Sequence, residues 1–329
     1  MKSLRLHGPG DLRLHEDPVP VPGVGERLLH VTAVGICGSD LHWFSEAGIG
    51  DSRLEKPLVL GHEFTAWTGD GVRVAVDPSI ACGECQFCLE GNPNFCEKII
   101  FAGHGHQDGA LREQIAWPER CLFPLPDSLS DADGVMLEPL GIAIHAVDLA
   151  HLKVGMNVGV FGCGPIGLLI IQLARLSGVR VVVATDKLSH RVDAACGFGA
   201  ENAILTADRT SVRQVAKAGD LHVTFEVAGE NEAVDDAVAS TRPGGKVMLV
   251  GIPADDRTEF TASVARRKGL TLKLVRRMKN TYPRAIDLVA KGLVDVRSLV
   301  THKFPLERVV EAFHTAERRE GLKVIVECK

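Results

Sequence analysis

The hydrophobic pattern changes along the chain, and the change marks two kinds of structure. Between about residues 148 and 276, short β-branched runs alternate with segments whose apolar residues recur at helical spacing. This alternation predicts an α/β domain with a doubly wound parallel sheet. The runs are VGVF (158–161), VVVAT (181–185), NAILT (202–206), HVTFEVAG (222–229), KVMLVGI (246–252) and LTLKLV (270–275), separated by segments such as PIGLLIIQLARLSG (165–178) and NEAVDDAVASTRPGG (231–245).

The two flanks of this region show a different pattern. Residues 1–147 are rich in glycine, proline and short strand-like runs, which is typical of an irregular β-rich domain. The segment 277–329 ends in a helical run followed by a strand-like run, and we expect it to complete that first domain. The sequence therefore predicts two domains, formed by 1–147 with 277–329 and by 148–276, as the length of 329 residues also suggests.

Composition and charge narrow the class of partner. The chain is 45% hydrophobic and 24% charged, with a formal net charge of -5. This acidic balance gives no electrostatic reason to bind nucleic acid or an acidic membrane surface. The first residues contain no apolar core of a signal peptide, and the run LLIIQLA (168–174) is too short to span a bilayer. We therefore expect a cytoplasmic protein that acts on a small molecule.

Four of the nine cysteines are clustered in the segment 82–96. An odd number cannot pair completely within the chain, and a reducing compartment keeps the thiols free. The spacing C-x2-C-x2-C-x7-C lets a loop place four thiolates around one tetrahedral zinc, with no position left for a substrate. A zinc ribbon that binds nucleic acid is the alternative, and the acidic balance counts against it. We predict a structural zinc held by Cys82, Cys85, Cys88 and Cys96, with the chemistry elsewhere.

A glycine motif follows the first β-branched run of the α/β region. Gly162, Gly164 and Gly167 form G-x-G-x-x-G, which permits a tight turn and the close approach of backbone N–H groups to a pyrophosphate. Asp186 directly follows the next predicted strand, where a carboxylate can bind the ribose hydroxyl groups of adenosine. Capping of the following helix is the alternative role for Asp186. The motif predicts a dinucleotide cofactor.

Three further stretches combine metal-binding and acid–base residues. VGICGSDLHWF (34–44) contains Cys37, VLGHEF (59–64) contains His62 and Glu63, and MLEPLGIAIHA (136–146) contains Glu138. A cysteine, a histidine and one or two carboxylates from separate loops match a catalytic zinc site with an open position. Taken singly, each residue has a structural alternative, such as a buried thiol or a charge in the first turn of a helix.

The order of these motifs resembles that of the zinc-dependent medium-chain alcohol dehydrogenase superfamily, and most closely its sorbitol (polyol) dehydrogenase branch. The resemblance covers nearly the whole chain and rests on GICGSDLHWF, VLGHEF, the four-cysteine segment, LEPLGIAIHA, GCGPIG and VTHKFPLERVVEAF. It implies that the β-rich domain is a GroES-like catalytic domain and that the α/β domain is a Rossmann domain for NAD. It also implies a homotetramer or a homodimer.

The resemblance assigns roles to individual residues. Cys37, His62 and Glu63 would bind a second, catalytic zinc, with Glu138 either a fourth ligand or the partner of a water at the metal. The other matched positions are a proton relay (Ser39 and His42), a substrate pocket (Trp43, Phe101 and Arg277, the two aromatic residues having a plain core role as the alternative) and a nucleotide site (Gly162, Gly164, Pro165, Ile166, Gly167, Asp186, Arg191, Val250, Gly251 and Ile252).

The activity that the resemblance implies is oxidation of a secondary hydroxyl of a polyol, of the sorbitol or xylitol type, to the ketose with transfer of hydride to NAD. Threonine or an aldose such as glucose is the alternative substrate within the superfamily. A non-catalytic, nucleotide-binding structural member is a further alternative. After GHEF the run TAWTGDGVRVAVDP (65–78) is shorter than in the family by about a strand and a turn, which bears on the packing beside the active site.

Overall fold

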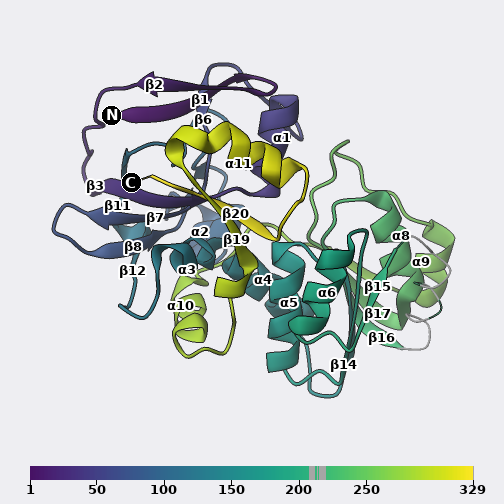
Figure 1. Ribbon diagram of the computed structural model, residues 1–329. Helices are drawn as coiled ribbons and strands as arrows, with labels where there is room; N and C mark the ends of the chain where they lie inside the picture. Colours follow the sequence, from purple (N-terminus) through teal and green to yellow (C-terminus); the bar gives the residue numbers. More distant parts are fainter. Residues whose placement is uncertain (207–211, 213, 215–219, 329) are drawn as a thin grey trace. The chain divides into compact units, whose positions relative to one another are not determined.

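The computed structural model describes residues 1–206, 212, 214 and 220–328, and the chain forms two compact units (Figure 1). One unit comprises Met1–Gly141 together with Lys279–Lys329, and the other comprises Ile142–Met278. The division falls at 141/142 and 278/279, where the hydrophobic pattern places it at 147/148 and 276/277. We refer to the first as the discontinuous unit and to the second as the central unit.

The central unit is built on a parallel sheet whose described strands follow the order β15-β14-β13-β16-β17-β18. Counted along this unit, the order is 3-2-1-4-5-6, which is the order of a Rossmann fold. The predicted doubly wound parallel sheet is therefore confirmed. Its elements are β13 (Asn157–Phe161), α5 (Pro165–Leu176), β14 (Val181–Asp186), α6 (Ser189–Gly197), β15 (Asn202–Leu205), β16 (Leu221–Glu226), α8 (Asn231–Ser240), β17 (Thr241–Leu249), α9 (Ala262–Lys268) and β18 (Thr271–Leu274).

The burial of the strands matches their positions in the sheet. Every residue of β13 is buried, as expected for an inner strand of a parallel sheet covered on both faces, whereas edge strand β18 is largely exposed. The strand order reverses at β13, between its neighbours β14 and β16. Sheets of this kind bind ligands at the carboxyl ends of the strands beside such a reversal. The glycine motif follows β13 at this end.

The discontinuous unit contains a mainly antiparallel sheet with the described order β12-β8-β7-β3-β20-β19, and β11 also pairs with β3. Strand β20 joins the C-terminal segment to the N-terminal strands, because it pairs in parallel with β19 and antiparallel with β3. The sheet strands are β3 (Glu26–Gly35), β7 (Glu63–Thr68), β8 (Arg73–Val76), β11 (Gln114–Pro118), β12 (Leu122–Pro124), β19 (Val300–Pro305) and β20 (Lys323–Glu327).

The remaining elements of this unit are short. A three-stranded sheet of order β2-β1-β6 and two two-stranded sheets, β4-β5 and β9-β10, complete its described β-structure. The strands are β1 (Lys2–Gly8), β2 (Asp11–Glu16), β4 (Gly48–Ile49), β5 (Ser52–Arg53), β6 (Leu58–Val59), β9 (Ser79–Ile80) and β10 (Ile100–Phe101). The helices are α1 (Gly38–Glu46), α2 (Gln86–Leu89), η1 (Pro93–Phe95), η2 (Glu119–Cys121), α3 (Asp131–Val135), α4 (Leu137–Ala150, which continues into the central unit), α10 (Tyr282–Ala290), η3 (Arg297–Leu299), η4 (Leu306–Arg308) and α11 (Val309–Glu317).

The segment 65–78, which the resemblance marks as shortened, contains a tight hairpin between β7 and β8. The backbone N–H of Thr68 donates to the carbonyl of Val72 (2.9 Å), and that of Gly71 donates back to the carbonyl of Thr68 (2.9 Å). The strand that begins at Glu63 therefore turns directly into β8, with no further strand between them.

Each unit has its own hydrophobic core. In the discontinuous unit, Trp43, Phe64 and Trp117 belong to one buried cluster with aliphatic residues of β1, β3 and α11. In the central unit, Phe161 and Val247 belong to a separate cluster. Within the described part of the chain, no helix combines the length and the apolar character needed to cross a membrane.

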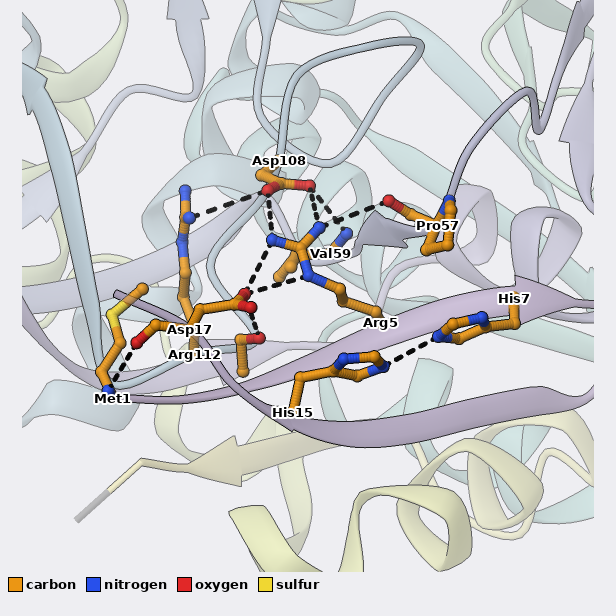
Figure 2. A network of polar contacts seen from close by, with 10 residues as sticks. Met1, Arg5, His7, His15, Asp17, Pro57, Val59, Asp108 and Arg112 are labelled. Atoms are coloured by element: carbon orange, nitrogen blue, oxygen red, sulfur yellow. Dashed lines mark hydrogen bonds and ion pairs between the residues drawn. The ribbon is translucent and has the colours of Figure 1, made fainter. Parts of the chain in front are cut away.

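A network of charged side chains ties the N-terminal hairpin to two loops of the discontinuous unit (Figure 2). Arg5 on β1 donates through Nη2 to Asp17 Oδ2 (2.7 Å) and to Asp108 Oδ2 (3.0 Å). Asp108 Oδ1 also accepts a hydrogen bond from the backbone N–H of Val59 (3.0 Å). Because Val59 lies three residues before His62, the network fixes the backbone that leads into a predicted metal ligand.

Candidate active site

Three predicted metal ligands meet in the discontinuous unit. Cys37 follows β3 and is the N-cap residue of α1, His62 precedes β7, and Glu63 begins β7. Strands β3 and β7 pair with Gly35 opposite Glu63, so the end of one strand lies beside the start of the other. One ligand atom of each of the three residues lies within 4.8 Å of the other two. The sheet register therefore assembles the set.

The donor atoms of this set suit a zinc ion. Sulfur, imidazole nitrogen and carboxylate oxygen are the ligands of catalytic zinc sites, in which three protein ligands leave one tetrahedral position open. His62 and Glu63 are only 5% and 1% exposed, and Cys37 is half-buried. A thiolate and a carboxylate at this depth require nearby positive charge, which a divalent metal would supply. The residues thus fit the metal that the motifs imply.

Asp40, which the sequence patterns did not mark, holds the imidazole of His62. Its carboxylate lies 3.4 Å from His62 Nδ1 and accepts hydrogen bonds from the backbone N–H groups of Cys37 (3.0 Å) and Gly61 (3.2 Å). Burial by itself would raise the pKa of Asp40, but His62 and the two N–H donors hold that pKa below its usual value. A carboxylate at one ring nitrogen orients the ring and leaves the other nitrogen for a metal. The sequence signal that could have marked Asp40 is its position three residues after the N-cap residue Cys37, which is the spacing of a capping box.

A buried ion pair joins Glu63 to Lys323, the first residue of β20. The two side chains are 1% and 3% exposed. Burial lowers the pKa of a lysine, but Glu63, Cys37 and Glu138 outweigh burial, so the pKa of Lys323 lies above its usual value. No sequence pattern marked Lys323, because strand pairing brings it to Glu63 from the far end of the chain.

Glu138 lies close to this set without belonging to it. It is buried in the first turn of α4, and among the described residues its carboxylate is not one of the three grouped ligand atoms. Burial raises the pKa of Glu138 to about 7, with further effects from His62 and Lys323, which lower it, and from Glu63, which raises it. A carboxyl group with this pKa can hold or release a proton near neutral pH.

The predicted relay residues lie on α1, directly after Cys37. Ser39 and His42 are three residues apart and therefore share a face of the helix, with His42 one turn farther along. Both are half-buried, and His42 Nδ1 lies 3.6 Å from Glu46 Oε1. The helix thus places the hydroxyl group of Ser39 and then the imidazole of His42 between Cys37 and the carboxylate of Glu46.

The three predicted substrate residues fall in different parts of the chain. The ring of Phe101 lies 5.2 Å from that of His62, centroid to centroid. Trp43 is buried, and the edge of its ring packs against His104 at a centroid distance of 5.5 Å. Arg277 belongs to the central unit, where its φ of 52° is in the left-handed region. A left-handed conformation is unusual for arginine and is found more often at functional positions than elsewhere.

The four clustered cysteines form a second donor set, with one ligand atom of each within 4.8 Å of the others. All nine cysteines of the chain are free thiols. The Sγ atoms of Cys85 and Cys82 lie 3.5 and 4.0 Å from that of Cys88, and sulfurs around a tetrahedral zinc are about 3.8 Å apart. Backbone N–H groups of Glu84 and Cys85 lower the pKa of Cys82 to about 6. The loop therefore favours a thiolate and fits a metal with four sulfur ligands.

The glycine motif forms a tight turn between β13 and α5. Gly162 has a φ of 111°, and an added Cβ there would lie 2.8 Å from the backbone nitrogen of Ala228. An added Cβ at Gly167 would overlap the carbonyl oxygen of Gly162. Gly164 is the N-cap residue of α5, and Pro165, which precedes Ile166, occupies its first turn. The glycines therefore allow this close packing, and their missing side chains let backbone N–H groups at the start of α5 approach a pyrophosphate.

Asp186 ends β14 beside this turn. Its carboxylate accepts hydrogen bonds from the backbone N–H groups of Cys163 (2.7 Å) and Leu188 (2.9 Å). Helix α6 begins at Ser189 with Leu188 as its N-cap residue, so Asp186 does not occupy the capping position. Arg191 on α6 approaches the same turn, because an added Cβ at Gly164 would lie 3.7 Å from its Nη1.

A buried carboxylate that the sequence patterns missed supports the second nucleotide loop. Val250 and Gly251 donate their backbone N–H groups to the carbonyl of Glu226 (2.9 and 3.1 Å), and Ile252 follows them. The Glu226 side chain accepts hydrogen bonds from the N–H groups of Ala228 (2.8 Å) and Gly229 (2.7 Å). Glu226 thus joins the ends of β16 and β17, beside the predicted nucleotide-site residues Val250, Gly251 and Ile252.

Comparison with known proteins agrees with this architecture. Residues 23–127 match the alcohol dehydrogenase GroES-like domain, and residues 165–291 match the zinc-binding dehydrogenase family. Sorbitol dehydrogenase of Gallus gallus is 36% identical over 338 residues (98% of this chain, 95% of the relative), and that of Bacillus subtilis is 33% identical over 341 residues (99% and 97%). The crystal structure of L-idonate 5-dehydrogenase from Escherichia coli superposes with a TM-score of 0.92 at 27% identity, covering 99% of this chain and 98% of that one.

The fold and the donor sets thus define an oxidoreductase built from a GroES-like domain and a Rossmann domain, as the motifs predicted. The chain belongs to the zinc-dependent medium-chain alcohol dehydrogenase superfamily, near the sorbitol dehydrogenases.

Proposed function

We propose that this protein is a zinc-dependent dehydrogenase that oxidises a secondary hydroxyl group of a polyol to the ketose, with NAD as the hydride acceptor. The observation that carries the proposal is the meeting of Cys37, His62 and Glu63, three donors that can hold a zinc ion and leave one tetrahedral position for a substrate. Similarity to sorbitol dehydrogenases over nearly the whole chain supports the polyol as substrate.

The chain supplies orientation and proton transfer around this site. Bound zinc supplies a Lewis acid that lowers the pKa of an alcohol. Asp40 keeps the imidazole of His62 in one orientation. Glu138, with its pKa of about 7, can exchange a proton or a hydrogen bond with a substrate hydroxyl or a water. Ser39 and His42 would pass the released proton along α1 toward solvent, because His42 is half-exposed.

We assign a second zinc to the cysteine segment 82–96, giving two per chain. The sulfur spacing and the N–H donors to the thiolates support this assignment. Four sulfur ligands close the coordination shell, so this zinc would stabilise the loop and take no part in the reaction. Metal analysis of the purified protein tests the pair: two zinc ions per chain are expected, and a single ion would overturn one of the assignments.

NAD is the proposed cofactor because of Asp186. The extra phosphate of NADP would bring negative charge against this carboxylate, at a cost on the order of 2 to 4 kcal/mol for an effective dielectric near 20. Lys187 does little to offset that charge, since its ammonium group is paired with Glu230 and lies 3.9 Å from Glu232. Equal kcat/KM values for NAD and NADP would contradict this assignment.

A polyol substrate fits the polar groups assigned to the site. One hydroxyl would react while a neighbouring hydroxyl forms a hydrogen bond with Glu138 or with a water that Glu138 holds, and this second contact selects the reacting hydrogen. A site that pairs a buried polar group with a hydroxyl disfavours an analogue that lacks it, by up to about 10⁴-fold. Ethanol should therefore be a poor substrate.

A substrate panel at saturating NAD tests the proposal directly. Sorbitol, xylitol, threonine, glucose and 2-butanol would be compared by kcat/KM, with Arg277→Ala and its exposed neighbour variant Arg276→Ala measured beside the wild type. We expect a polyol to be best, and we expect Arg277→Ala to lower kcat/KM for the polyol far more than for 2-butanol. If threonine or glucose is the best substrate, the polyol assignment is wrong although zinc and hydride chemistry stand. No NAD-dependent turnover with any alcohol would favour the non-catalytic alternative.

We also propose that the protein is cytoplasmic and, on the strength of the family resemblance, that it forms a homotetramer or a homodimer. Light scattering of the purified protein, which yields the molar mass in solution, tests the assembly. A mass equal to the 35.4 kDa of one chain would refute it.

A further inference from the structure

Lys323 is a buried cation at the proposed catalytic centre, and the proposed reaction assigns it no role. Its side chain is 3% exposed and forms an ion pair with Glu63, which is itself a proposed zinc ligand. Lysine is almost never fully buried unless it is paired. The Glu63 carboxylate can therefore interact with two cations, the ammonium group of Lys323 and the metal.

The backbone is shaped to accept this pair. Gly35 on β3 lies opposite Glu63 on β7 and opposite Ile325 on β20, so the two charged side chains reach one another across this glycine. A Cβ added to Gly35 would lie 2.1 Å from Glu63 Oε2 and 3.0 Å from Lys323 Cε. The space that the missing side chain leaves is filled by the ion pair, and the pair is thus a built feature of the strand junction.

The charges around Lys323 come from three elements. Glu63 on β7, Cys37 before α1 and Glu138 on α4 are the anionic groups that act on it, and burial acts against its charge. With all three ionised they carry three negative charges, and the carboxylate of Asp40 behind His62 adds a fourth, so a divalent metal and one ammonium group leave one negative charge. Without the ammonium group, one further negative charge would face the metal, and such a site binds the metal more tightly.

We propose that Lys323 is a positioning residue that competes with the catalytic metal for one oxygen of the Glu63 carboxylate and so keeps that oxygen from occupying the coordination position that the substrate needs. This inference rests on the proposed function of the Cys37, His62 and Glu63 set. The expected effect of removing the ammonium group is unusual, because metal affinity should rise while turnover falls. A lysine that merely stabilised the fold would, when replaced, weaken both.

Three variants of the holoenzyme separate these roles. Lys323→Met removes the charge and keeps most of the length, Lys323→Arg keeps the charge, and Lys303→Met removes an exposed lysine from neighbouring strand β19 as the control. The metal dissociation constant would be measured by chelator competition. The absorption spectrum of the cobalt-substituted protein would report ligand number, and kcat and KM would be measured for the best substrate of the panel.

For Lys323→Met we expect metal binding at least tenfold tighter, equal to about 1.4 kcal/mol, a changed cobalt spectrum and at least tenfold lower kcat/KM. Lys323→Arg should stay within about threefold of the wild type in metal affinity, because a cation still holds the carboxylate. Metal affinity and spectrum unchanged in Lys323→Met, or weaker metal binding, would overturn the proposal. So would a Lys323→Arg variant that loses turnover as completely as Lys323→Met.

If Lys323→Met does not fold, the double variant Lys323→Met/Glu63→Gln avoids an unpaired buried charge and is compared with Glu63→Gln alone. With the carboxylate already gone, the lysine substitution should tighten metal binding less than it does in the presence of Glu63, and an equal or larger gain would contradict competition for Glu63. The result also stands apart from the main proposal. A wild type that holds no metal at Cys37 would refute the proposed function, whereas an active, metal-loaded wild type with an unaltered Lys323→Met would refute only this inference.

Discussion

Substituting Gly35 by alanine tests whether the Glu63 carboxylate lies where the structure places it. Gly35 has no positive φ, so alanine fits its backbone and the substitution acts through its methyl group alone. That methyl group would lie 2.1 Å from Glu63 Oε2, 2.8 Å from Val135 Cγ1 and 3.0 Å from Lys323 Cε. The nearest obstacle is therefore a proposed zinc ligand.

The size of the effect follows from these distances. Real Cβ contacts essentially never fall below 3.0 Å, so the Glu63 oxygen must move by at least 3.0 - 2.1 = 0.9 Å. Metal–ligand distances tolerate about 0.2 Å, and a misplacement near 1 Å can lower a rate about 10²-fold. Crowding of Val135 and Lys323 adds a stability cost of about 1 to 3 kcal/mol. We expect loss of catalytic zinc and a drop of about 10²-fold or more in kcat/KM.

The assay compares Gly35→Ala with Gly69→Ala for zinc content, urea unfolding and steady-state turnover. Gly69 follows β7, the strand that begins with Glu63, and an added Cβ there meets no atom within 4 Å. The control should resemble the wild type in all three measurements. If Gly35→Ala also keeps two zinc ions and full turnover, the carboxylate cannot occupy the space beside Gly35, and the reasoning about the ion pair fails with it.

Three further outcomes are expected. Cys88→Ser should lower the zinc content by one ion per chain and lower the melting temperature, and unchanged metal content would argue against the four-sulfur site. Asp133→Asn should lower stability by about 1 kcal/mol at pH 7 in urea unfolding, because Asp133 accepts a hydrogen bond from Arg297 (2.7 Å). Burial opposes ionisation but Arg297 holds the pKa of Asp133 below its unfolded value, so this stabilisation is present above about pH 4 and should vanish as the pH falls further. Tyr282→Phe should cost about 1 to 2 kcal/mol, since its buried hydroxyl donates to the carbonyl of Val76 (2.7 Å); no measurable loss would mean that this bond is not made.

The fold of the central unit was predictable because each strand is a contiguous, buried apolar run. Burial on both faces, as at 157–161, removes the polar alternation and leaves a pattern that sequence alone reveals. The discontinuous unit gave weaker signals, since several of its strands are two residues long, as at Gly48–Ile49 and Leu58–Val59. Their pairing depends on contacts between distant segments, such as Ile325 with Gly35, which no local pattern encodes.

The sequence likewise reveals some residues of the candidate site and not others. Cys37, His62 and Glu63 were foreseeable because their side chains are chemically distinctive and stand in recognisable motifs. Asp40 and Lys323 were missed, since an aspartate in the first turn of a helix and a lysine at the start of a strand look ordinary in sequence. What makes them special is burial beside a ligand, and burial is a property of the assembled sheet.

The two missed residues have one physical feature in common. Each is a charged group with almost no exposure, and each faces one of the proposed ligands, Asp40 the imidazole of His62 and Lys323 the carboxylate of Glu63. A buried charge is costly unless it is paired, so the fold keeps such groups only where the pairing is close. The ligand residues of a motif can bind a metal. Their orientation and the net charge around them depend on partner residues that the motif does not include. Activity at this site should therefore depend on Asp40 and Lys323 as well as on the ligands, with a loss of about 10- to 100-fold when such a partner is replaced.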